Sequence, residues 1–186
     1  MTKDNRYKVK QFILYIAKKM NSAERFGEAK LNKVLYRADH EALRQLGRKI
    51  TTYNYQKNNY GPTLSAYKPL LQEMATAGLI AWETRPAGQQ VENRPCAVGE
   101  PDMDVFLPEE VSIIDQEIER AWSSSGRGVS DEEHETAAWY ATRRGSPINS
   151  SLTLVEDPRV IIPLSDDERQ MADAALSRFF ARTGSS

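Results

Sequence analysis

The two histidines are the first residues to consider for catalysis or metal binding. His40 lies in the sequence ADHEA and His134 in EEHETAAW, both in stretches that we predict to be helical. Metal-binding helices carry their ligands four residues apart, as in the HExxH motif, and neither histidine has a second histidine at that spacing. We therefore predict no catalytic or metal site. His40 is expected at the surface or at a helix cap, and His134 in the core with a hydrogen bond.

Recognisable nucleophiles and phosphate-binding loops are also missing from the sequence. The serines at 123–125 lie in a serine- and glycine-rich loop rather than in a strand–turn–helix elbow. Cys96 has no histidine near it in sequence, and neither GxGxxG nor GxxxxGK occurs. Acidic residues cluster where helices are predicted to begin, where they compensate the helix dipole. We therefore predict that the protein is not an enzyme, has no cofactor and takes no small-molecule substrate.

Composition favours one globular domain, with or without a terminal extension. The chain has 186 residues and a formal net charge of −1, from 25 basic and 26 acidic side chains. This balance gives no support to nucleic-acid binding through bulk electrostatics. The single cysteine excludes an internal disulfide and a cysteine-based zinc site. No apolar run reaches the ~18 residues of a membrane span, and no signal peptide is recognisable. We expect a cytoplasmic protein.

Hydrophobic periodicity and helix-end signals predict about six helices. Capping boxes predict the start of the last two, and glycines predict several of the ends. The predicted helices are 6–21, 28–46 closed by Gly47, 65–77 closed by Gly78, 108–122, one from Ser130 to Gly145, and one that begins at Ser165. In the fourth helix we expect Val111, Ile114, Ile118, Ala121 and Trp122 to face the core.

The β-structure predicted from the sequence is small. Residues 79–84 and 95–98 are expected to form a hairpin-like wing, and residues 104–107 a third short strand. Residues 48–62 are predicted to be irregular or weakly extended, and residues 146–163 mostly extended. The predicted fold class is therefore mainly α: a single domain of about six helices with a small antiparallel β-hairpin, a winged-helix-like element, and a C-terminal helix.

A helix followed by a hairpin wing is the arrangement of winged-helix DNA-binding domains. Such a surface needs several lysines or arginines, because phosphate contacts dominate affinity. The helix at 65–77 offers only Lys68, and the wing balances two arginines against two glutamates. A winged-helix-like transcription regulator therefore remains an alternative, without a clear DNA footprint.

A tyrosine-rich segment, TTYNYQKNNYGPT, follows the second predicted helix. Pro62 fixes its own φ and forces Gly61 out of the α region, so this pair predicts a fixed turn. Tyrosines pack in cores and are also enriched at interfaces, and the sequence leaves both alternatives open. Phe179 and Phe180 are consecutive on a helix, so they cannot both face one core. The candidate partner-binding residues are Tyr53, Tyr55, Tyr60, Trp82 and Phe180.

Five motifs, in this order, give the chain a resemblance to a known family. They are KLNKVLYRADHEA (30–42), NYGPT (59–63), LLQEMATAGLI (70–80), SDEEHETAAW (130–139) and RGSPIN (144–149). Together they resemble the Panacea domain of SocA-like antitoxins, which also include phage-associated GepA-type proteins. The resemblance implies a domain at 1–149 and a C-terminal extension at 150–186. The residues that carry the motifs are Lys30, Leu31, Leu35, Tyr36, Gly61, Pro62, Gly78, His134 and Trp139.

The resemblance implies a bacterial or phage antitoxin that binds and neutralises a protein toxin encoded in the same operon. SocA-type members also deliver the toxin to a protease, and no catalysis or cofactor comes with the family. The expected partners are the cognate toxin, a protease or a second copy of the chain, rather than DNA or a membrane. The segment before Gly61 is longer and richer in tyrosine than in many members, so the class of toxin is not implied.

Overall fold

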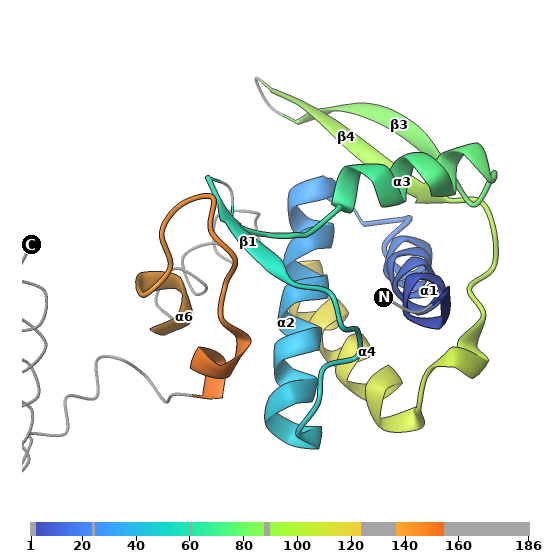
Figure 1. Cartoon of the computed structure of the whole chain (residues 1–186). Helices are drawn as coiled ribbons and strands as arrows, with labels where there is room; N and C mark the ends of the chain where they lie inside the picture. The colour runs from blue at the N-terminus through green and yellow to red at the C-terminus, as the bar shows by residue number, and fades with distance from the viewer. Residues whose placement is uncertain (1–2, 24, 60, 88–89, 124–136, 155–186) are drawn as a thin grey trace, which may run out of the picture.

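The computed structural model describes residues 3–23, 25–59, 61–87, 90–123 and 137–154 (Figure 1). Tyr60, His134, Phe180 and the helix predicted to begin at Ser165 lie outside these residues. The longer elements are α1 (Lys3–Lys19), α2 (Glu28–Leu46), β1 (Tyr55–Asn58), β2 (Gly61–Leu64), α3 (Tyr67–Thr76), β3 (Ile80–Ala87), β4 (Gln90–Ala97) and α4 (Pro108–Ser123). The shorter ones are the 3₁₀ helix η1 (Met103–Val105), α6 (Ala137–Tyr140) and the 3₁₀ helix η2 (Ser150–Leu154).

The prediction of a mainly α fold with about six helices and one hairpin is wrong. In the described part of the chain there are five α-helices, four of them substantial, and two separate two-stranded antiparallel sheets, so the fold is mixed α/β. The second sheet was missed because residues 48–62 carry polar side chains between their tyrosines. Tyr55 pairs with Leu64 and Asn58 with Gly61, and Tyr55 and Leu64 are both buried.

The first two helices form as their hydrophobic periodicity predicts. α2 ends at Leu46, and Gly47 adopts the left-handed conformation with φ 71°. Its N–H donates to the Leu43 carbonyl across 3.1 Å, which caps the helix. All five residues predicted to face the core are buried: Val9, Phe12, Ile13 and Ile16 in α1, and Met20 directly after it.

α3 begins at Tyr67, two residues later than predicted, because Ala66 has a positive φ of 60° that no helix residue adopts. Pro69 lies in the first turn, as expected, where its missing N–H costs no helical hydrogen bond. Gly78 follows the helix with φ 70°. The predicted inward face is confirmed: Tyr67, Leu70, Leu71 and Met74 are buried.

α4 buries Ile114, Ile118 and Ala121 as predicted. Trp122 was expected in the core, but its side chain is 46% exposed. Successive residues on a helix point about 100° apart. Ala121 is the last residue on the buried face, and Trp122 therefore points away from it. Residues 104–107 were expected as a strand, but 104 and 105 belong to η1, where the Asp102 carboxylate accepts from the Asp104 N–H.

The region after residue 136 also differs from the prediction. α6 ends at Tyr140, so the prediction that Gly145 closes this helix is wrong. Gly145 has φ 79° and lies in the turn that leads into residues 146–149. Residues 150–154, expected to be extended, form η2.

The wing consists of β3 and β4, and its presence is confirmed. The two strands pair from Ile80 with Ala97 to Ala87 with Gln90, so the hairpin is longer than predicted. In Figure 1 the wing and α3 lie side by side across one end of the α1 and α2 pair. The main core lies between α1, α2 and α4, and it includes Phe106 from the loop before α4.

Candidate functional site

The segment RGSPIN lies against β1 as a third, irregular strand. The Gly145 N–H donates to the Lys57 carbonyl across 2.7 Å, and the Lys57 N–H donates to the Ser146 carbonyl across 3.0 Å. The Ile148 N–H donates to the Tyr55 carbonyl across 2.7 Å. β1 is therefore paired on both edges, and motifs almost 90 residues apart in the sequence meet along it.

Lys57 also connects β1 to α6. Its Nζ donates to the Trp139 carbonyl across 2.7 Å and lies 4.5 Å from the centre of the indole ring. This geometry combines a charged hydrogen bond with a cation–π contact. Through these contacts Trp139, from the SDEEHETAAW motif, lies beside the β1–β2 hairpin.

Asp39, fully buried on α2, is the centre of a polar cluster. One carboxylate oxygen accepts from the Thr51 N–H, and the other accepts from the hydroxyls of Thr51 and Tyr55, each across 2.8 Å. Burial raises the pKa of the Asp39 carboxyl to about 6, although these donors and the charge of Lys49 favour the ionised form. The cluster fixes both the loop after α2 and β1.

His40 is buried beside this cluster, so the prediction of a surface or cap position is wrong. Its Nδ1 lies 2.6 Å from the Tyr36 carbonyl, which requires that this nitrogen carry the proton and donate. The imidazole packs against the rings of Tyr36 and Tyr55, with centroids 3.9 and 5.7 Å away. Burial lowers the pKa of His40 to about 4, so the ring is neutral at pH 7.

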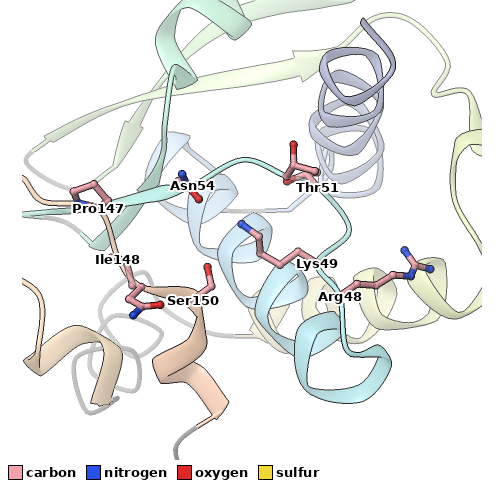
Figure 2. A pocket seen from close by; sticks show the side chains of 9 residues that line it. Arg48, Lys49, Thr51, Asn54, Pro147, Ile148 and Ser150 are labelled. Carbon is pink, nitrogen blue, oxygen red and sulfur yellow. The ribbon is translucent and has the colours of Figure 1, made fainter. Parts of the chain in front are cut away.

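A pocket of about 580 Å³ opens next to this cluster, between the loop that follows α2 and the segment that follows α6. Figure 2 shows Lys49, Asn54 and Ser150 directed into the space between the two segments. Lys49 donates to the Tyr53 carbonyl, and Arg48 pairs with Glu110 across 2.6 Å. Thr51 separates the pocket from Asp39, to which it is bonded. Seven of the nine lining residues are polar or charged, and Pro147 and Ile148 are the apolar ones.

The wing exposes large apolar side chains on one face, where Thr84 and Asn93 are also exposed. Trp82 is 45% exposed and Val91 68% exposed. Trp82 and Pro86 lie on the same side of β3, with Thr84 between them, and Pro86 pairs with Val91, so Trp82, Pro86 and Val91 share a face. We call Trp82, Pro86 and Val91 the wing face.

The same hairpin is anchored from its other side by Arg94, whose side chain is fully buried. The guanidinium donates to the carbonyls of Met20 and Ala23 across 2.7 and 2.8 Å, and also to that of Asn21. It therefore caps the turn that follows α1 and lies 5.7 Å from the Phe26 ring centre. Arg94 thus attaches the wing to the turn after α1, while Trp82 and Val91 are exposed on the other side of the hairpin.

A family model described as antitoxin SocA-like, Panacea domain, matches residues 31–140, which is more than half of the chain. The chain belongs to this family. No curated protein and no solved structure matches it. The domain boundary that we predict near residue 149 stays a prediction.

In this Panacea domain the early motifs have structural positions. Leu31, Leu35 and Tyr36 are buried on α2. Lys30 is also buried, and burial lowers its pKa. The negative charge of Glu92 on β4 acts in the opposite direction and raises it. Gly61 has φ 115°, outside the α region as predicted, and it opens β2 together with the buried Pro62.

The candidate partner-binding residues separate into two groups. Tyr53 and Tyr55 are only 3% and 1% exposed, so the structure places both in the core of the Panacea domain. Trp82 is half exposed on the wing face. Sequence reasoning missed Asp39 and Arg94, which organise the buried side of both hairpins. Asp39 follows Leu35 by four residues, and this spacing on the apolar face of α2 was the available signal.

The DNA-binding alternative loses support from the charges of the wing. Arg94 is buried and bonded to three carbonyls, so it cannot reach a phosphate. Arg85 pairs with Glu83 across 2.9 Å. Among the described residues no group of three histidine, cysteine or acidic side chains could hold a metal ion. None of the helices in the described ranges is long and apolar enough to cross a membrane.

Proposed function

We propose that this chain is an antitoxin that binds a protein toxin encoded in the same operon and neutralises it by direct contact through the wing face. Membership of the SocA-like antitoxin family supports a protein partner. The single observation that carries the choice of surface is the position of Trp82. It is a large aromatic side chain, 45% exposed, on a hairpin that is anchored from behind.

Physical properties of the wing favour this surface. Interfaces concentrate their binding energy in a few aromatic and arginine residues, and tryptophan is the most enriched among them. A surface already held in place loses little conformational entropy on binding. Arg94 holds the hairpin in place through its three carbonyl partners, and the antiparallel pairing of β3 and β4 keeps Trp82 and Val91 on one face.

The proposal assigns no catalysis to the chain. Asp39 and His40 are buried groups with shifted pKa values, and such groups are the usual candidates for chemistry. Both oxygens of the Asp39 carboxylate accept hydrogen bonds from Thr51 and Tyr55. Asp39 and His40 are both buried. Their positions suit a structural cluster that fixes β1.

Growth rescue tests this function. The gene adjacent to this chain is expressed alone and together with it, and growth is measured. The proposal predicts arrest by the neighbour alone and rescue by the wild-type chain. Trp82→Ala is expected to lose rescue while its thermal melting stays unchanged. Trp122→Ala is the matched control, since Trp122 is 46% exposed but lies on α4, and it is expected to rescue fully.

Arrest that persists with the wild-type chain would reject the antitoxin function. Rescue by Trp82→Ala as complete as that by Trp122→Ala would reject the wing face as the contact. The half-life of the toxin separates simple neutralisation from delivery to a protease, because only delivery shortens it.

A further inference from the structure

The outer edge of β3 is an unpaired strand edge within the described structure. The Val98 N–H donates to the Leu79 carbonyl across 2.9 Å, and the ladder of β3 with β4 continues from there in one register. Backbone groups in an antiparallel ladder point alternately toward and away from the partner strand, so this bond fixes the directions of the rest. The N–H and C=O groups of Trp82 and Thr84 therefore point away from β4, and no other described segment bonds to them.

The outer edge of β4, in contrast, is interrupted. The Asn21 side chain bonds to both backbone groups of Ala97 across 3.2 and 3.3 Å, which also shows that these groups point away from β3. Pro95, the next outward position, has no N–H to donate. Trp82 and Thr84 are both exposed, so β3 offers the more open edge of the wing. Such an edge is a template for a further strand.

The charges on β3 favour a second copy of the same strand as the occupant of this edge. Glu83 and Arg85 lie on the face of β3 opposite to Trp82, and their side chains are 43% and 44% exposed. In an antiparallel pairing of two copies centred on Thr84, Glu83 of each copy lies directly opposite Arg85 of the other. Opposite charges at such cross-strand positions stabilise a sheet, whereas like charges destabilise it.

The neighbouring registers are less favourable. A pairing centred on Glu83 sets the two glutamates directly against each other, and a pairing centred on Arg85 does the same with the two arginines. A pairing centred on Trp82 uses the backbone of Ile80, which is only 3% exposed. The charges and the burial of β3 therefore select the register centred on Thr84.

The exposed side chains of the wing also match in this register. Thr84 lies opposite Thr84 of the second copy, and Asn93 pairs with Thr84 within each wing. Trp82 lies opposite Pro86 of the second copy, which in turn pairs with Val91 of that copy. Threonine pairs and aromatic side chains beside apolar ones are stabilising cross-strand neighbours. The polar and apolar side chains of the two wings thus continue each other across the joint.

Pro86 sets the end of this pairing. It has no N–H, and prolines at sheet edges limit the addition of further strands. In the register centred on Thr84, the Pro86 carbonyl still accepts from the Trp82 N–H of the second copy, and the two Thr84 residues exchange both of their backbone bonds. The proline therefore limits the pairing to a short stretch and leaves its centre open.

We propose that two copies of the chain associate through the outer edges of their β3 strands, in an antiparallel pairing centred on Thr84 that joins the two wings into one four-stranded sheet. Edge pairing covers the edge of a strand rather than the face of a sheet, so the wing faces of both copies stay open on one surface. The inference goes beyond the proposed function and does not depend on it, because it follows from β3 itself.

Charge reversal tests the register. Analytical ultracentrifugation of the full-length chain, over a dilution series up to about 0.1 mM, measures the dissociation constant of the dimer. Glu83→Arg and Arg85→Glu each set like charges against each other in their own dimers, so the dissociation constant is expected to rise at least ~5-fold. An equimolar mixture of the two variants restores both opposite-charge pairs between copies, and the mixed dimer is expected to regain the wild-type affinity. Mixing leaves the charges within each chain unchanged, so this recovery cannot come from folding.

Proline substitution tests the edge itself. Thr84→Pro removes the outward N–H at the centre of the pairing and no hydrogen bond between β3 and β4, so the dimer is expected to be lost while the wing stays folded. Asn93→Pro is the matched control, because Asn93 is the residue of β4 that pairs with Thr84 and its N–H points away from β3. Asn93→Pro is expected to dimerise like the wild type. Circular dichroism melting of both variants checks that they fold.

Three results would overturn the proposal. The first is a wild-type chain that stays monomeric throughout the dilution series. The second is a Thr84→Pro variant that dimerises as well as Asn93→Pro. The third is a dimer whose dissociation constant is the same in the wild type, in the two charge variants and in their mixture, because its contact would then lie elsewhere.

Growth rescue separates this inference from the proposed function. A wild-type chain that is monomeric but rescues growth leaves the antitoxin function standing and rejects the pairing of β3. A chain that dimerises as predicted but does not rescue growth leaves the pairing standing and rejects the antitoxin function. Trp82 takes part in both contacts, so rescue by the monomeric Thr84→Pro variant would assign the expected defect of Trp82→Ala to the toxin contact.

Discussion

The Tyr55 hydroxyl donates to the Asp39 carboxylate across 2.8 Å, and this bond ties β1 to the buried face of α2. The same carboxylate accepts from the backbone and side chain of Thr51. β1 in turn carries the hydrogen bonds to the RGSPIN segment. A single buried aspartate therefore organises the hairpin around which the family's motifs meet.

Removal of the Tyr55 hydroxyl tests this organisation. Tyr55→Phe leaves Asp39 with its bonds from Thr51 but deletes one charge-assisted bond, so the free energy of unfolding is expected to fall by about 1.5–3 kcal/mol. Urea unfolding followed by circular dichroism gives the value. The control is Tyr140→Phe, because Tyr140 is 67% exposed and its variant is expected to match the wild type. Equal stability of the two variants would contradict the role of the bond.

Asp39 and His40 should make the free energy of unfolding depend on pH, and their two contributions should have opposite signs. The pKa of Asp39 is raised to about 6, so the folded state holds its proton more tightly than the unfolded chain. Its contribution to the free energy of unfolding falls as pH rises from about 4 to about 6. The pKa of His40 is lowered to about 4 from its ordinary 6.5, so its contribution rises as pH increases from about 4 to about 6.5.

Single variants separate these two opposing contributions. Relative to the wild type, His40→Gln should lose stability as pH rises from about 4 to about 6.5, by on the order of 3 kcal/mol at 1.36 kcal/mol per pKa unit. Asp39→Asn should gain relative stability from about pH 4 to about 6. Urea unfolding at half-unit pH intervals measures both differences. Profiles that run parallel to that of the wild type would show that burial does not shift these groups.

Arg94 should control the attachment of the wing. Arg94→Met leaves the carbonyls of Met20, Asn21 and Ala23 without their shared donor, so we expect a loss of about 2–4 kcal/mol and faster amide exchange in β3 and β4. Arg85→Met is the control, since Arg85 forms an exposed pair with Glu83 that contributes little. Wing amides that exchange at the wild-type rate in Arg94→Met would refute this anchoring role.

Local patterns predicted the helices better than they predicted the sheets. α1 and α2 follow from apolar spacing and from Gly47, because both signals act within a few residues along the chain. β1 was not found in this way. Its partner β2 is close in the sequence, but residues 145–148, which pair with its other edge, are distant. Backbone hydrogen bonds to a segment about 90 residues away pair this second edge, and the local sequence of β1 carries no signal for that pairing.

The candidate site was predictable in its residue types but not in their exposure. The sequence singled out tyrosines and Trp82 and left core and interface open, because both environments suit an aromatic ring with one polar atom. Burial decides between them: Tyr55 bonds to Asp39 in the core, whereas Trp82 is 45% exposed on the wing face. Arg94 was counted only as a charge, since no spacing rule links it to the turn after α1.

The most direct test of the antitoxin account is the affinity between the purified chain and the purified product of the adjacent gene, measured by isothermal titration calorimetry. The account predicts a specific complex with the wild-type chain and with Trp122→Ala. For Trp82→Ala it predicts binding about 30-fold weaker or more, equivalent to the roughly 2 kcal/mol of an interface hot spot. Absence of any complex with the wild-type chain, or equal affinity for the two tryptophan variants, would contradict it.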